Sequence, residues 1–159
     1  METQTMELVS KETFLNNWQG HRNLTRRVID SFPEKDLFEF SIGGMRTFAQ
    51  LADELISIAT PGLKEIISLK AEPLAEGKHE YKTKAELLAR WDEDTKEINR
   101  LWNEIPDARF NEKHKLFGQY EDTVINSLQY FVDNEIHHRG QGYVYLRALG
   151  IQPPFFWER

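Results

Sequence analysis

The sequence contains no cysteine among its 159 residues. This excludes disulfide bonds, thiolate metal ligands and a cysteine nucleophile, and it fits a reducing compartment. Long hydrophobic runs are also missing: there is no stretch of about 18 apolar residues, so we expect no transmembrane helix. The first residues lack a basic start followed by an apolar stretch. We therefore expect no secretory signal and a cytoplasmic location.

Positive charge is in deficit as well. Lys and Arg number 20 against 26 Asp and Glu, which gives a net charge of −6. A protein that binds the phosphate backbone usually carries a basic face, so the charge argues against nucleic acid as a partner. Hydrophobic residues make up 40% of the chain, which is enough for one folded unit with a sizeable core. We assign residues 1–159 to a single domain.

Helical periodicity dominates the chain, and strand signals are almost missing. There is no Asn-Gly or Asp-Gly hairpin turn and no sustained alternation of polar and apolar residues. Apolar residues recur instead at three-to-four spacing in four segments. We expect helices from Lys11 to Ser31, from Thr47 towards Pro73, from Thr83 to Pro106, and from about Tyr120 to Leu149.

The helix ends carry recognisable signals. Thr47-Phe-Ala-Gln50 and Thr83-Lys-Ala-Glu86 each have the form of a capping box. Thr60-Pro61 is expected to cap and restart the second helix, or to kink it. The connections at 32–46, 71–82 and 106–118 are long enough for crossovers. Four amphipathic helices without strands predict an all-α fold, a four-helix bundle.

Ionisable residues interrupt the apolar seam of the last predicted helix. Glu135 and His138 follow the three-four repeat of that seam, and Asn134 lies one turn before His138. In the second helix, Glu54 points near the apolar stripe, whereas Asp53 falls on the wetter side. Carboxylate and imidazole groups that meet inside a bundle suit Zn, Ni, Mn or Fe. Two plainer interpretations stay open: a buried hydrogen-bond network, or a salt bridge from Glu54 to a basic residue.

Two metal motifs match only in part. The segment Asn134–His138 lacks the first His of H-E-x-x-H, and Glu135-x-x-His138 lacks the second helical copy that a di-iron bundle needs. We expect the remaining separated histidines, His21, His79 and His114, to be surface or packing residues. The aromatic end of the chain, residues 153–158, is too apolar for a free terminus, so it should fold back over a groove or a partner subunit.

Several segments together resemble the DinB-like family of metalloenzymes. They are His137-His-Arg-Gly-Gln141, Tyr145-Leu-Arg-Ala-Leu-Gly150, Pro153-Pro154 and Met45-Arg-Thr-Phe48. The resemblance implies a bundle of up-down-down-up order, often a homodimer. It also implies a divalent metal held by three histidines, one in the second helix and two spaced four apart in the last. Relatives of this kind include low-molecular-weight thiol S-transferases and a maleylpyruvate isomerase, in which the metal activates a thiolate.

Carried over position by position, the resemblance retains one of the three histidines. The third family His falls on His138, the second on Asn134 and the first on Glu54. The implied metal ligands are therefore Glu54, Asn134 and His138, with Zn, Ni or Fe as the divalent ion. Because an amide oxygen is neutral, we expect this binding to be weak or absent, and Asn134→His to restore it. Glu135 would orient a ligand or act as a base.

Three functions compete at this point. The first is a metal-dependent enzyme, such as a thiol S-transferase or a hydrolase, that acts on a small-molecule thiol or an electrophilic substrate. The second is a non-catalytic bundle for binding or dimerisation, whose metal site has been lost. The third, DNA binding, is suggested only by the family name and is opposed by the net charge of −6. We expect a homodimer, with neither nucleic acid nor membrane as a partner.

Overall fold

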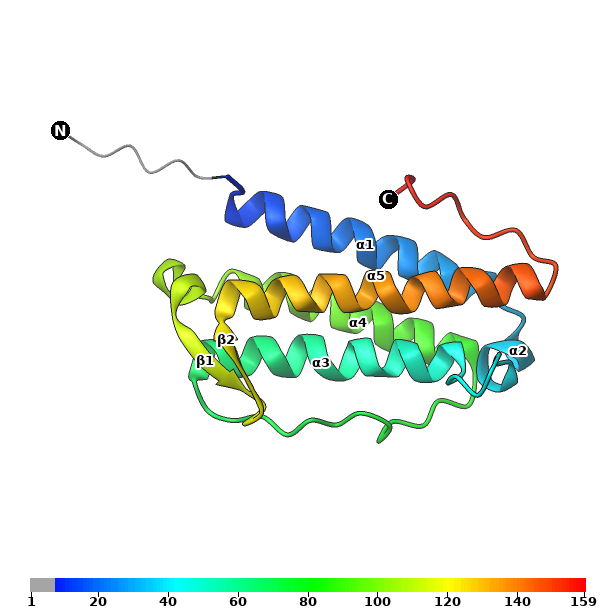
Figure 1. The fold of residues 1–159 in the computed structure, drawn as a ribbon, viewed down its shortest axis with the longest axis horizontal. Helices are drawn as coiled ribbons and strands as arrows, with labels where there is room; N and C mark the ends of the chain where they lie inside the picture. Colours follow the sequence, from blue (N-terminus) through cyan, green and yellow to red (C-terminus); the bar gives the residue numbers. More distant parts are fainter. Residues whose placement is uncertain (1–7) are drawn as a thin grey trace.

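Four long helices form the body of the protein, as the computed structural model of residues 8–159 shows (Figure 1). Residues 1–7, which the sequence prediction assigns to the same domain, lie outside the described range. The long helices are α1 (Lys11–Ser31), α3 (Phe48–Ser68), α4 (Lys84–Trp102) and α5 (Val124–Ala148). The shorter elements are α2 (Glu34–Glu39), the 3-10 helix η1 (Asp107–Asn111) and the strands β1 (Lys113–Leu116) and β2 (Tyr120–Thr123).

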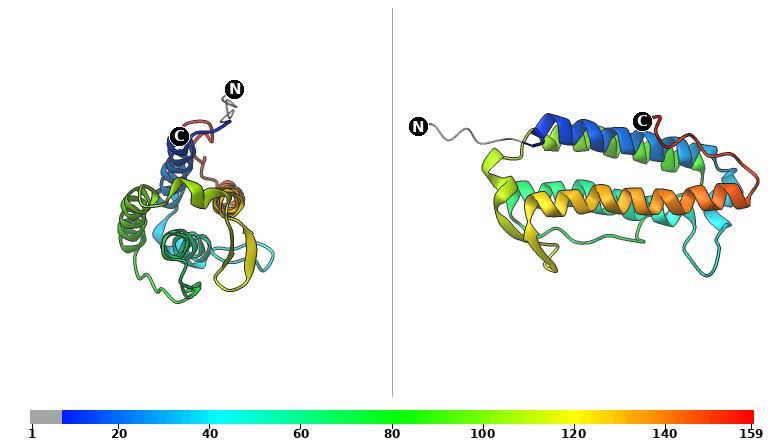
Figure 2. Two further views of the ribbon diagram at one scale, coloured as in Figure 1. Left: turned by 90° about the vertical axis from the view of Figure 1, so that its left-hand side faces the viewer. Right: turned by 45° about the horizontal axis from the view of Figure 1, so that its top comes forward.

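The helices run up, down, down and up, so the predicted four-helix bundle and its order are confirmed (Figure 1). Seen from its end, the bundle has α1 and α3 at opposite corners, and each packs against both α4 and α5 (Figure 2). Because α3 and α4 are parallel, residues 69–83 must travel back along the whole bundle. No helix among residues 8–159 is both long and apolar enough to cross a membrane.

The helix starts follow the predicted caps. Thr47 and Gln50 form both bonds of a capping box at the start of α3. The Thr83 side chain accepts from the Glu86 backbone, but the Glu86 carboxylate reaches back to the N–H of Lys82 instead of Thr83. The predicted restart at Pro61 is wrong, because α3 continues through it as one helix. Buried apolar neighbours on both sides of Pro61 offset the lost backbone hydrogen bond.

The last helix begins four residues later than predicted, and the difference is a β-hairpin. Residues 120–123 form β2, which pairs antiparallel with β1 in a register that sets Lys115 opposite Glu121. The connecting turn places Phe117 and Gly118 at positive φ, a conformation that glycine adopts without strain. The hairpin escaped detection because its strands are short, charged and mostly exposed, so no apolar alternation marks them.

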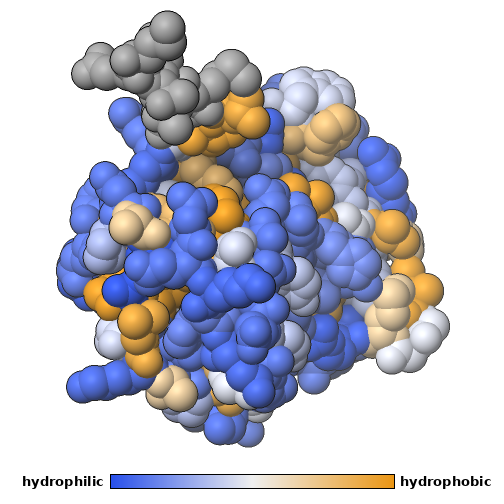
Figure 3. Space-filling view, turned by 60° about the vertical axis from the view of Figure 1, so that its left-hand side comes forward, coloured by the Kyte–Doolittle hydropathy of each residue, from blue (hydrophilic) through white to orange (hydrophobic). Residues whose placement is uncertain are grey.

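Two apolar clusters fill the bundle, one towards the hairpin and one towards α2. The first includes Trp18, Trp102 and Leu128, and the second includes Phe48 and Trp91. By contrast, the face in Figure 3 is mostly hydrophilic, with apolar residues in small separate patches. On this face, the helices therefore leave little continuous apolar surface exposed.

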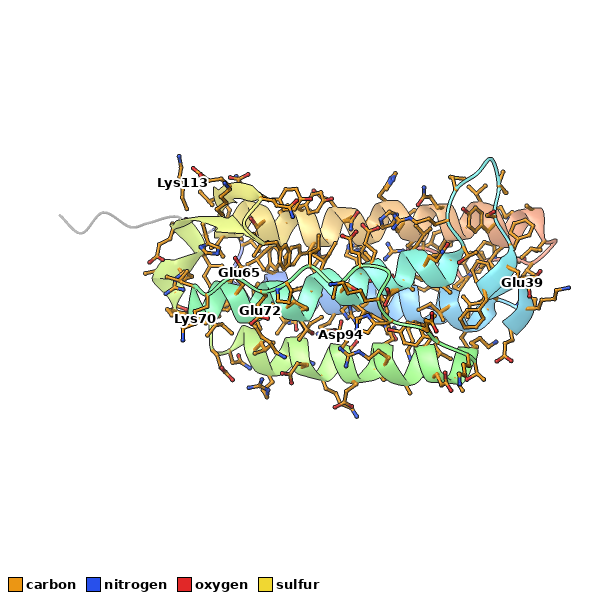
Figure 4. The ribbon with its side chains drawn as sticks, turned by 90° about the horizontal axis from the view of Figure 1, so that it is seen from below. Glu39, Glu65, Lys70, Glu72, Asp94 and Lys113 are labelled. Carbon is orange, nitrogen blue, oxygen red and sulfur yellow. The ribbon has the colours of Figure 1, made fainter. Side chains whose placement is uncertain are left out.

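A buried ion pair lies between these clusters. Arg22 of α1 forms an ion pair with Asp94 of α4, with 3.0 Å between nitrogen and oxygen, and its guanidinium lies 4.0 Å from the Trp91 ring centroid. Asp94 accepts a hydrogen bond from Thr60, and in Figure 4 it lies between α4 and α3. Burial raises the pKa of Asp94 while the Arg22 charge lowers it. Since an unpaired buried charge is costly, this layer fixes how α1, α3 and α4 meet.

His21 is a second buried polar group, on the side of α1 that meets α5 and the chain end. Its ring lies 3.0 Å from an Arg139 nitrogen and 2.7 Å from an Arg159 nitrogen. Burial, together with these two positive charges, lowers the pKa of His21 from 6.5 to about 4. The unfolded chain therefore binds a proton more readily than the folded one between these values. This contribution to stability is complete above pH 6.5 and is lost as the pH falls towards 4.

We predict that His21→Gln flattens the acid limb of the stability curve. Between pH 7 and pH 4.5 the wild-type protein should lose about 2 kcal/mol more unfolding free energy than the variant, because only the wild type carries this histidine. Urea unfolding at the two pH values measures the difference. The exposed His137→Gln is the matched control and should behave as wild type. Equal pH dependence in wild type and His21→Gln would contradict the assignment.

Candidate functional site

Glu54 is the centre of the candidate site. It lies on α3, and its Oε1 accepts hydrogen bonds from Asn134 Nδ2 at 3.1 Å and from His138 Nε2 at 3.0 Å. Residues four apart share a face of a helix, so α5 presents both donors to α3 together. The other oxygen, Oε2, forms an ion pair with Arg46, which precedes the capped start of α3. The structure thus brings together the three residues that the sequence analysis singled out; their role as metal ligands stays a prediction.

The charges of this cluster support one another. Burial alone would raise the pKa of Glu54, but hydrogen bonds from His138, Asn134 and Arg46 outweigh it and hold the pKa at about 2. Burial lowers the pKa of His138, but its bonds to Glu54 and to Gln141, at 2.9 Å, raise it overall. Both ring nitrogens of His138 face oxygen acceptors, an environment that suits the doubly protonated ring. The cluster is a carboxylate held between the Arg46 guanidinium and a histidine ring whose pKa is raised.

This arrangement does not fit a resident divalent metal. A metal ligand must offer a lone pair, so histidine must be neutral and glutamate free to coordinate. Here Asn134 turns its NH₂ group, as assigned from its hydrogen bond, towards Glu54, and Arg46 already neutralises the same carboxylate. Among residues 8–159, no group of three or more Asp, Glu or His side chains is arranged to hold a metal. The salt bridge considered as the plainer alternative for Glu54 is present, and its partner is Arg46.

Glu135 is not part of this cluster. Although it lies on α5 beside Asn134, its carboxylate faces α1 and accepts a hydrogen bond from Thr25 at 2.7 Å. The side chain is fully enclosed, and burial raises its pKa against the opposing effects of Arg22 and Thr25. Arg139 of α5 reaches the same part of α1 through the His21 carbonyl. The structure therefore places Glu135 at the contact of α5 with α1, away from Glu54.

The sequence analysis missed a second polar cluster beside Glu54. Asp53, expected on the wetter side of its helix, is buried because the crossover 69–83 covers that face. Its carboxylate accepts hydrogen bonds from Gly77 N and from the Tyr81 hydroxyl, each at 3.2 Å. It also forms a hydrogen bond with His79 Nδ1 at 3.0 Å. These contacts tether the crossover to α3. Arg46 was also missed as a partner of Glu54, although it stands inside the Met45–Phe48 segment that carries the family resemblance.

Two cavities open on either side of Glu54. The first measures about 510 Å³ and lies between α3, α5, the crossover and the hairpin. The second measures about 470 Å³ and is lined by Arg46, Asp53, His79 and Tyr81, among others. Glu54 lines both cavities. A ligand in either one would therefore meet a carboxylate whose position is fixed by three donors.

The protein is thus a helical bundle with a polar centre between its second and fourth long helices, α3 and α5. Its sequence matches the DinB family over residues 1–158. The chain belongs to the DinB family. Its structure is similar to a DinB-like protein from Bacillus cereus ATCC 10987, with a TM-score of 0.74 and 19% identity over 91% of this chain and 95% of that one. A DinB-like protein from Bacillus subtilis gives a TM-score of 0.72 and 17% identity over 92% and 99% of the two chains. No curated protein matches the sequence.

We predict that Glu54→Gln destabilises the protein by about 2 kcal/mol, because it leaves Arg46 and His138 without their shared counter-charge in a partly buried setting. Urea unfolding at pH 7 measures the loss. Glu80→Gln, an exposed carboxylate on the neighbouring cavity wall, is the control and should change stability by less than about 0.5 kcal/mol. If the two variants were equally stable, the cluster around Glu54 would contribute nothing measurable to the free energy of unfolding.

Proposed function

We propose that this DinB-family protein is a small-molecule-binding bundle whose centre is held by ion pairs in place of a resident metal. The observation that carries the proposal is the engagement of Glu54 by Arg46, Asn134 and His138 at the wall of a 510 Å³ cavity. That volume falls within the range of about 300–1,000 Å³ usual for small-molecule sites. The partner we propose is a small molecule.

A metal-dependent enzyme is the second candidate, of the thiol S-transferase kind that the family resemblance implies. The observation that favours it is the convergence of Glu54, Asn134 and His138 on one point between α3 and α5. One changed ligand, Asn134→His, would give two imidazoles and a carboxylate, a set that suits Zn, Ni or Fe. In the chain as it stands, Arg46 competes with any cation for Glu54.

The two candidates differ in a calorimetric titration of untagged protein with zinc and nickel chlorides. We expect wild type to show no stoichiometric binding at micromolar concentration. Asn134 is a weak ligand, and Arg46 already occupies the Glu54 carboxylate that would bind the ion. Asn134→His combined with Arg46→Gln should bind at least about tenfold more tightly. Gln129→His combined with Arg46→Gln, which puts the imidazole on an exposed position of α5, controls for surface coordination.

Wild type that binds as tightly as the double variant would overturn the proposal and favour the metal-dependent enzyme. If neither protein binds, the metal-dependent candidate loses its support.

We also propose that the protein is a homodimer. Its last residues fold back along α1. There Arg27 donates a hydrogen bond to the Glu158 carbonyl, and Arg159 donates one to the ring of His21. Yet Phe155, Phe156 and Trp157 remain between 47% and 65% exposed, which leaves apolar surface for a second copy to cover. Light scattering at micromolar concentration measures the oligomeric state.

A further inference from the structure

The cavity beside Glu54 has an unusual combination of lining residues. Four are aromatic: Phe117, Tyr120, Tyr130 and Phe131. Four carry carboxylates: Glu54, Glu76, Glu121 and Asp122. The remaining lining residues are aliphatic or neutral polar, and none of those described is Lys, Arg or His. The cavity is therefore both apolar and anionic.

The aromatic rings form a floor and a rim. Phe117 and Phe131 are at most 9% exposed and lie deep, whereas Tyr120 and Tyr130 are each 57% exposed. Exposed rings at the mouth of a cavity present π-faces that a cation can approach. The rings come from two elements, the hairpin and α5, so they surround the space from different sides.

A buried carboxylate of α3 holds the β1–β2 hairpin in place where the hairpin lines the cavity. Glu65 of α3 accepts from the backbone of Phe117 at 3.1 Å, bonds His114 at 2.8 Å and also receives the N–H of Glu72. Figure 4 shows Glu65 and Glu72 close to the hairpin end of α3. Phe117 is thereby held in its left-handed conformation against the cavity. A wall fixed in advance lowers the entropy cost of binding.

The described lining residues carry net negative charge, because they include four carboxylates and no basic side chain. Asp122 is bonded to Asn126 and to the Thr123 N–H, and these contacts lower its pKa, so it stays ionised. Burial and the Glu54 charge raise the pKa of Glu76, and burial together with Glu54 raises that of Tyr130. Of the nearby basic residues, Arg46 and His138 are bonded to Glu54, and Lys115 is the cross-strand neighbour of Glu121. The negative charge open to a ligand therefore comes mainly from Glu76 and Asp122.

We propose that this cavity binds a small organic cation, an ammonium group carried on an apolar or aromatic body. The proposal rests on the small-molecule function above and names the ligand class of the same cavity. The ammonium would lie among Glu76, Tyr120 and Tyr130, where the carboxylate supplies charge and the rings supply cation–π contacts. The apolar body would pack on Phe117, Phe131 and Ile58. An anionic ligand would meet four carboxylates and no basic lining residue.

Three probes of nearly equal shape test the charge preference: 2-phenylethylammonium, the neutral 2-phenylethanol and the anion phenylacetate. Each is titrated into ¹⁵N-labelled protein at pH 7 and followed by amide chemical shifts. We expect the ammonium to bind at least about tenfold more tightly than the alcohol, since a charge and a cation–π contact are added. Phenylacetate should not bind. The shifts should fall on residues 116–131 and on Glu54 and Glu76.

Two substitutions locate the ammonium. Glu76→Gln and Tyr130→Leu should each weaken ammonium binding by about fivefold to tenfold, because each removes one of its contacts. Glu76→Gln should leave the affinity for 2-phenylethanol unchanged. Glu80→Gln, on the wall of the other cavity, is the matched control and should change nothing. These positions are exposed, so the fold should tolerate all three changes.

The outcomes separate this inference from the proposed function. If 2-phenylethanol binds as well as the ammonium, the cation preference is overturned while small-molecule binding stands. If phenylacetate binds best, or if none of the probes binds, the inference is overturned. Tight zinc binding by wild type in the calorimetric titration would instead overturn the proposed function, whatever the probes show.

Discussion

A carboxylate buried between two helices needs hydrogen-bond donors, and the satisfaction of Glu54 is the constraint on which the rest of the site depends. Its donors come from Arg46, which precedes α3, and from Asn134 and His138, one turn apart on α5. Removing one partner of a buried pair costs more than the pair itself contributes, because a charge is then left alone. The relative position of α3 and α5 is therefore coupled to the chemistry of the site. A divalent ion would have to displace these donors in order to bind Glu54.

The up-down-down-up order creates the space around this centre. Parallel neighbours α3 and α4 require a chain that returns along the bundle, and two carboxylates of α3 tether that crossover. Asp53 holds its later part, and Glu65 holds its start together with the hairpin. The crossover and the hairpin then wall the two cavities that meet at Glu54. Buried acidic groups of one helix thus shape the walls of the proposed ligand site.

The features marked by local signals could be predicted from the sequence. The bounds of α1 were predicted, and the starts of α3 and α4 followed from Thr47 and Thr83, because side-chain caps are local interactions. The convergence of Glu54 with His138 followed from helix periodicity and from the family resemblance. The hairpin was not predictable in this way, since its exposed charged strands lack an apolar pattern. Its turn is held by the hydrogen bond from Phe117 N to Glu65, about fifty residues away in the sequence.

The partners of individual polar groups were harder to predict. Periodicity placed Glu135 on the same seam as His138, but the rotation of α5 turns it towards Thr25 and α1. Asp53 was assigned to solvent because the path of the crossover over α3 cannot be inferred from helix periodicity. Arg46 lies outside any helix, so no periodic pattern could direct it to Glu54. These outcomes depend on tertiary geometry, which decides what the centre can bind.

The most direct test of the central claim is a crystal structure of the untagged protein grown with millimolar zinc chloride, with data collected at the zinc absorption edge. The account predicts that Arg46, Asn134 and His138 remain bonded to Glu54, with no anomalous peak between α3 and α5. A zinc ion within about 2.0–2.2 Å of Glu54 and His138, with Arg46 displaced, would contradict it.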